Sequence, residues 1–168
     1  FQSRLNSTIR EQHGWSYGFN SRATWLKGPG SERAAGAVTR EKTDSSLMEA
    51  MTQIRGMTGA IPITETELTA ARNALTLSLP SNLQSNAGTE AIVSQIVDNN
   101  LPKSWWSSYI DSIRQTTAAD VAAMTSEYMD PNHLTILIVG DGAKITAGVK
   151  ATGIAPVVEL DKTGQKVP

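Results

Sequence analysis

The hydrophobic period of the sequence changes abruptly at Gly14, and this change constrains the fold more than any other feature. Before the glycine, Leu5 and Ile9 lie four residues apart and therefore share one face of a predicted helix. A glycine in this position is a typical helix stop. After it, alternate residues are aromatic, which is typical of a strand with one aromatic face: Trp15, Tyr17 and Phe19. The chain is therefore expected to end a helix at Gly14 and fold directly back as a strand.

This predicted turn brings two polar side chains towards one place. Arg10 falls in the last turn of the helix, and Tyr17 lies early in the strand that folds back past the helix end. A guanidinium and a phenol are both hydrogen-bond donors, and together they suit an anionic or carbonyl oxygen. Each also has an ordinary structural explanation. Arginine stabilises the C-terminal end of a helix dipole, and tyrosine is a common packing residue in strands.

The segment 3–17 resembles the second half of the pitrilysin- and insulinase-like zinc metallopeptidases, a family that includes the mitochondrial processing peptidases. That half carries Ser-Arg-Leu, then Leu-Arg-Glu, then Gly-x-x-Tyr, and this chain matches with Ile9 in place of the second leucine. The order of elements also agrees through about Gly140. The resemblance implies an α/β (α+β) fold with two layers, a mainly antiparallel sheet and helices on one face. It also implies a single domain over residues 1–168, with residues 141–168 as its C-terminal extension.

The resemblance implies a function as well. In this family one half holds zinc through a His-x-x-Glu-His helix and a distant glutamate, and the glutamate within the motif activates water. The other half contributes the arginine and the tyrosine. On this chain, Tyr17 would donate a hydrogen bond to the substrate carbonyl oxygen as it becomes an oxyanion, and Arg10 would hold the substrate backbone. These two residues are the predicted catalytic and substrate-binding residues of a peptide-degrading zinc metalloendopeptidase.

The zinc motif itself is missing from the sequence. The two histidines, His13 and His133, are far apart, and neither forms part of a His-x-x-Glu-His motif. We therefore expect no metal on this chain, with Zn²⁺ held by a zinc-bearing half that is fused to it or is a separate subunit. His13 lies within one turn of Arg10, but a solvated histidine near a helix end is the favoured explanation. The chain alone is expected to be inactive.

Two other functions are compatible with parts of the sequence. A non-catalytic structural or assembly subunit could share the fold without the chemistry, although such a subunit would not need both Arg10 and Tyr17. A nucleotide-binding domain would rest on Gly140-Asp141-Gly142 alone, which lacks the remainder of a glycine-rich motif. A search upstream for an intact His-x-x-Glu-His motif would separate the first two functions.

Composition restricts the function classes further. The net charge of −1 over 168 residues gives no argument for binding nucleic acid or an anionic membrane, and no apolar run reaches membrane-spanning length. The absence of cysteine excludes disulfides and thiolate catalysis, and it suits a periplasmic protein, with the cytoplasm as the alternative. The sequence opens on Phe1 within a predicted helix, so we expect an N-terminally truncated piece of a longer protein. An exposed sheet edge would then favour self-association of the fragment.

The remaining elements are predicted from period and capping. Three strands are expected at 15–26, 33–42 and 134–139, the last as a buried central strand because it is apolar and rich in β-branched residues. A short last strand is expected at 157–160. Two helices should begin with capping boxes, Thr64 with Glu67 and Thr117 with Asp120. The predicted helices span residues 43–56, 64–79, 89–99, 104–114, 117–128 and 143–149.

Overall fold

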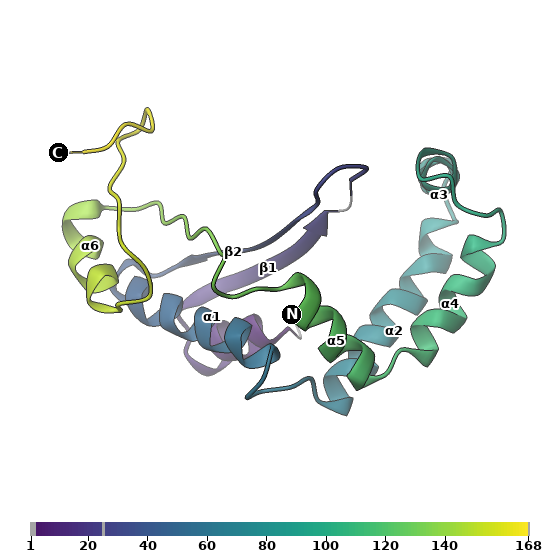
Figure 1. Cartoon of the computed structure of the whole chain (residues 1–168), viewed down its shortest axis with the longest axis horizontal. Helices are drawn as coiled ribbons and strands as arrows, with labels where there is room; N and C mark the ends of the chain where they lie inside the picture. The colour runs from purple at the N-terminus through teal and green to yellow at the C-terminus, as the bar shows by residue number, and fades with distance from the viewer. Residues whose placement is uncertain (1–2, 25, 168) are drawn as a thin grey trace. The chain divides into compact units, whose positions relative to one another are not determined.

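The computed structural model describes residues 3–24 and 26–167, and at residue 82 the backbone alone (Figure 1). The fold is α+β, with an antiparallel sheet of two strands in the described part of the chain. The elements follow one another as η1 (Asn6–Gln12), β1 (Ser16–Thr24), β2 (Ser31–Val38), η2 (Arg40–Lys42), α1 (Thr43–Met57), α2 (Glu65–Asn82), α3 (Asn86–Asp98), α4 (Trp105–Gln115), α5 (Ala118–Tyr128) and α6 (Gly142–Ala151). No helix in the described residues is both long enough and apolar enough to cross a membrane.

The chain divides into two compact units. The first contains Phe1–Thr24, Ser31–Ala60 and Asp130–Pro168, and the second contains Trp25–Gly30 and Ile61–Met129. The first unit therefore holds both strands together with η1, α1 and α6, whereas the second holds α2 to α5. The single domain expected from the sequence stays a prediction.

In the first unit, η1 packs against both β1 and α1, and α1 also packs against α6. The predicted helical face is confirmed, because Ile9 is completely buried and Leu5 is buried beside it. The helix is wound as a π-helix, with hydrogen bonds between residues five apart, instead of the α-helix that the spacing favoured. Gly14 ends it with a φ of +66°, the left-handed conformation that glycine adopts most easily.

The two strands are shorter than predicted, and their bounds differ. The strand expected at 15–26 spans Ser16–Thr24, and residue 25 lies outside the described residues. The strand expected at 33–42 spans Ser31–Val38 and gives way to the 3₁₀-helix η2. The hydroxyl of Thr43 donates to the carbonyl of Arg40 (2.8 Å), which ties this turn to the first residue of α1 and ends the extended conformation.

The prediction of a buried central strand at 134–139 is wrong. In the described part of the chain this segment pairs with no strand, and Val139 is 90% exposed, with Leu137 exposed beside it. Its apolar, β-branched composition favours an extended backbone, but a strand also needs a neighbour to bond with. The last strand expected at 157–160 is also absent, and an isolated bridge between Leu160 and Lys166 lies there instead.

The second unit is helical, and both predicted capping boxes are confirmed in it. The amide of Glu67 donates to Thr64 Oγ1 (3.2 Å), and the amide of Thr64 donates to the Glu67 carboxylate (2.8 Å). Thr117 and Asp120 make the same exchange at the start of α5. Helix α2 continues for two residues beyond Pro80, which was expected to stop or kink it.

Helices α2 and α4 pack together within this unit, with Leu68 and Leu79 of α2 buried. The guanidinium of Arg72 donates to the carbonyl of Thr116, which lies immediately after α4 (Nε to O, 3.0 Å). The carbonyl at this helix end is thereby satisfied by a charged donor, which is stronger than a neutral hydrogen bond.

Candidate functional site

Arg10 lies in the last turn of η1, where it was predicted. Its side chain is 33% exposed and its guanidinium pairs with the carboxylate of Glu11 (Nη1 to Oε1, 2.8 Å). The backbone at this end is closed by hydrogen bonds from the amide of Gly14 to the carbonyl of Arg10 (2.9 Å) and from Trp15 to Ile9 (2.9 Å). The helix end therefore presents a partly exposed cation on a fixed backbone.

Tyr17 lies at a β-bulge near the start of β1. Ser16 pairs with Val38 and Gly18 pairs with Ala37, so Tyr17 is an extra residue with no partner across the ladder. Its side chain is 97% exposed. Bulges redirect a side chain out of the regular alternation and occur frequently beside active sites. The phenol is accordingly open to any group that approaches this end of the strand.

The bulge corrects one prediction from the sequence. Trp15, Tyr17 and Phe19 were expected to alternate on one face of a strand, but Trp15 and Phe19 are half-buried while Tyr17 is exposed. One extra residue interrupts the period of two, so residues on either side of it no longer share a face by simple counting.

The structure thus places the two predicted site residues on elements that are in contact, η1 and β1. We call the region where these two elements meet, residues 6–19, the corner between η1 and β1. Within it, Arg10 is partly exposed and Tyr17 is almost wholly exposed. Their roles in binding and catalysis stay predictions.

His13 and Trp15 flank the left-handed Gly14 and stack on each other. Their ring centroids are 4.0 Å apart and the planes are 9° from parallel. The ammonium group of Lys42 lies 5.7 Å from the centre of the Trp15 ring. The exposed His13 ring therefore covers one face of Trp15, a contact that sequence reasoning missed. Two rings separated by one turn-forming glycine were the available signal.

His133 lies in an ordinary local arrangement. Its ring pairs with Asp130 (Nδ1 to Oδ2, 2.5 Å) three residues before it, and both side chains are exposed. The pKa of Asp130 is lowered, first by the hydrogen bond from the backbone of Asn132 and then by that from His133. In the described part of the chain, no group of three or more His, Asp or Glu residues could hold a metal ion.

Sequence reasoning missed two further residues at the corner, Asn6 and Ser16. Asn6 is buried and its side-chain amide bonds to the backbone of Phe19, whereas the hydroxyl of Ser16 bonds across the bulge to Gly18 and Ala37. Asn6 lies three residues before Ile9 and therefore on the buried helical face. A polar residue on an apolar face was the signal that could have identified it.

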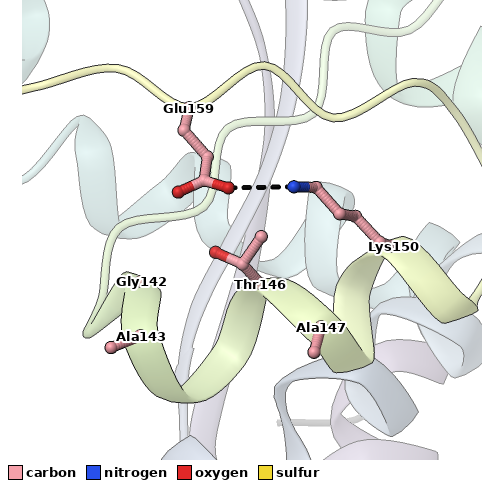
Figure 2. Close-up of a pocket in the computed structure, with 6 residues that line it drawn as sticks. All are labelled: Gly142, Ala143, Thr146, Ala147, Lys150 and Glu159. Carbon is pink, nitrogen blue, oxygen red and sulfur yellow. Dashed lines mark hydrogen bonds and ion pairs between the residues drawn. The ribbon is translucent and has the colours of Figure 1, made fainter. Parts of the chain in front are cut away.

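A shallow depression lies on α6, close to the Gly140-Asp141-Gly142 sequence (Figure 2). Lys150 crosses it to pair with Glu159 (Nζ to Oε1, 3.0 Å), as Figure 2 shows. The paired lysine is already neutralised by a carboxylate, so the depression gives no support to a phosphate site. Its volume is about 360 Å³ and its lining consists of Gly142, Ala143, Thr146, Ala147, Lys150 and Glu159.

Comparison with known structures identifies the architecture. A crystal structure of a peptidase M16 inactive domain from Pseudomonas fluorescens superposes with a TM-score of 0.70 and 23% sequence identity over 78% of this chain. The fold is that of a peptidase M16 domain. This chain spans 31% of the length of the Pseudomonas protein. No protein-family model matches the sequence, and no curated protein matches it.

The M16-type fold agrees with the α+β architecture expected from the segment 3–17. At 23% identity the likeness establishes the architecture and leaves the activity open. The Pseudomonas domain is described as inactive. The sequence of the present chain contains no His-x-x-Glu-His motif.

Proposed function

We propose that this chain is the half of an M16-type zinc metalloendopeptidase that carries Arg10 and Tyr17 and stabilises the transition state of peptide hydrolysis. The observation that carries the proposal is the bulge at Tyr17, which leaves the phenol 97% exposed on a strand that contacts the helix of Arg10. A tyrosine used only for packing would be at least half-buried, and this one packs on almost nothing. Likeness to an M16 domain supports the proposal at the level of fold.

The proposed roles follow from the chemistry of the two donors. The Tyr17 hydroxyl donates to the substrate carbonyl oxygen, and this bond strengthens as negative charge develops there. Arg10 donates to the carbonyl groups of the substrate backbone. Its pairing with Glu11 does not prevent this, because exposed ion pairs contribute at most about 1 kcal/mol and exchange readily with other acceptors.

The zinc-bearing half, fused or separate, supplies the metal that activates water. The residues of this chain bind and orient the peptide and donate hydrogen bonds to it. The proposed substrate is a peptide, and the proposed partner is the zinc-bearing half.

The first test is peptide cleavage by the full-length protein, or by this half mixed with its zinc-bearing partner, with and without a chelator. Tyr17→Phe should lower kcat by about 10²- to 10³-fold, equivalent to about 3–4 kcal/mol, because one donor to the oxyanion is lost. Arg10→Ala should reduce kcat/KM. A quenched fluorescent peptide gives both constants.

Tyr128→Phe is the matched control. Tyr128 is exposed on α5 in the second unit, and its substitution should leave kcat unchanged. Chelator-sensitive cleavage that does not respond to Tyr17→Phe or Arg10→Ala would remove the proposed roles while keeping the M16-type fold.

A non-catalytic assembly subunit is the second candidate. Two observations favour it: the neighbouring Pseudomonas domain is described as inactive, and this chain has no zinc motif. Stable association with the zinc-bearing partner, without cleavage in any combination, would support this function over the first.

A further inference from the structure

We propose that Asn6 is a positioning residue, which holds the strand of Tyr17 at a fixed place against the helix of Arg10. The inference rests on the function proposed above, since positioning matters only if Tyr17 acts on a substrate. Asn6 belongs to η1 and is 5% exposed. Its partner is the backbone of Phe19, two residues after Tyr17 in β1.

The Asn6–Phe19 contact has the pattern of a strand pairing. The amide of Phe19 donates to Asn6 Oδ1 (2.8 Å), and Asn6 Nδ2 donates to the carbonyl of Phe19 (2.9 Å). The side-chain amide thus offers the same donor and acceptor as the backbone of a neighbouring strand. Each backbone group of Phe19 needs the opposite kind of partner, which sets the orientation of the Asn6 side chain.

Contacts on both sides hold Asn6 in this orientation. Its Nδ2 also donates to the hydroxyl oxygen of Ser3 (3.0 Å), one turn earlier. The strand passes close to this side chain, since a Cβ on Gly18 would lie at an ordinary contact distance of 3.6 Å from Asn6 Oδ1. With both polar atoms of its side chain bonded and almost no exposure, Asn6 joins the helix and the strand at a single point.

Ser16 fixes the other side of the bulge. The amide of Gly18 donates to Ser16 Oγ (3.0 Å), and the same hydroxyl donates to the carbonyl of Ala37 on β2 (2.6 Å). One side chain therefore satisfies two backbone groups beside the position where Tyr17 interrupts the ladder. This arrangement restrains the chain on the side of Tyr17 opposite to Phe19.

The need for such restraint follows from the exposure of Tyr17. A side chain that is 97% exposed cannot be held in place by packing. Its direction must come from the backbone, which is restrained before it by Ser16 and after it by Asn6. A displacement of about 1 Å at a reacting group can reduce the rate about a hundredfold, so this restraint is a requirement for catalysis by Tyr17.

Asn6→Asp tests this role with almost no change in size. The substitution replaces the Nδ2 donor with a carboxylate oxygen facing the carbonyl of Phe19, where two acceptors repel. In the full-length protein with its zinc-bearing half, we expect kcat to fall about tenfold to a hundredfold, with KM within about twofold of the wild type. Asn20→Asp is the control, because Asn20 is exposed one residue further along β1.

A double variant separates positioning from a general structural role. If Asn6 acts through Tyr17, then Asn6→Asp combined with Tyr17→Phe should have the same kcat as Tyr17→Phe alone. If the fold reductions in kcat of the two single variants multiply in the double variant, then Asn6 acts independently of Tyr17 and the inference is overturned. Wild-type kcat for Asn6→Asp would overturn it as well.

Two further experimental outcomes bear on the inference. If Asn6→Asp does not fold, judged by circular dichroism, then Asn6→Ala replaces it in the same cycle, because it removes both hydrogen bonds to Phe19 without burying a charge. Full activity of Tyr17→Phe would overturn the proposed function and this inference together. Loss of activity in Tyr17→Phe, with an independent loss of activity from the substitution at Asn6, would overturn the inference alone.

Discussion

The corner between η1 and β1 and the segment 134–139 share a composition that favours an extended backbone, but only the corner forms a strand. At the corner, β2 pairs with β1, and side chains satisfy the backbone where the ladder is interrupted. Segment 134–139 forms no strand in the described residues, and most of its apolar residues are exposed. The comparison teaches that a strand depends on its neighbours at least as much as on its own residues.

The largest expected loss of stability comes from a substitution on the buried side of the corner. Ile9→Ala should lower the free energy of unfolding by about 2–5 kcal/mol, because Ile9 is completely buried in η1 and the truncation leaves a cavity. Val139→Ala, in the segment 134–139, removes apolar carbons from an exposed side chain and should change stability by less than about 0.5 kcal/mol. Urea unfolding of the two variants measures both values.

Similar losses for the two variants would mean that segment 134–139 is buried in solution and that the contrast between the two regions is false.

A smaller effect is expected where the strands of the corner meet. Gly36 pairs with Phe19 across the sheet, and a Cβ on Gly36 would lie 2.6–2.7 Å from three atoms of the Phe19 ring. One of the three is Cγ, the ring carbon attached to Cβ, so the whole Phe19 side chain would have to move. Gly36→Ala should therefore lower the free energy of unfolding by about 1–3 kcal/mol.

Gly28→Ala serves as the control, because a Cβ on Gly28 would meet nothing within 4 Å. Thermal unfolding compares the two variants. An unchanged midpoint for Gly36→Ala would show that the ring of Phe19 does not lie over the glycine.

The smallest expected effect concerns the capping box of α5, where side chains satisfy the backbone as they do at the corner. The pKa of Asp120 is lowered, first by the hydrogen bond from the backbone amide of Thr117 and then by that from its hydroxyl. A carboxyl group with a depressed folded pKa stabilises the protein above its unfolded pKa of about 3.9. This contribution is lost as the pH falls through the lower, folded pKa.

Asp120→Asn should therefore remove part of the stability loss below about pH 4 and leave the remaining acid sensitivity in place. Urea unfolding between about pH 2 and 6 measures how the free energy of unfolding changes with pH. An acid profile identical to that of the wild type would indicate that the capping bonds of Asp120 do not form in solution.

Local signals were the reliable part of the prediction from sequence. Thr64 with Glu67 and Thr117 with Asp120 cap their helices as expected, since capping is decided by residues three apart. Leu5 and Ile9 share a buried face for the same reason. Arg10 lies in the last helical turn because Gly14 follows four residues later and ends the helix.

Features that depend on distant pairing could not be predicted in this way. The bulge at Tyr17 exists because β2 pairs in a register that skips one residue of β1, which the sequence of β1 does not reveal. Segment 134–139 has strand composition, but composition cannot say whether a neighbour is present. The site residues Arg10 and Tyr17 were found through resemblance to a family, whereas Asn6 and Ser16 required the hydrogen bonds themselves.

Because of the bulge, the side chain exposed at position 17 is independent of the pairing between β1 and β2. From Gly18 onward the strand keeps its register with β2, and none of that pairing involves the side chain at position 17. The chain can therefore exchange this one residue for another of different reactivity without shifting any other residue of the sheet. Position 17 is thus a natural point at which the chemistry of this scaffold can diversify during evolution or be redesigned.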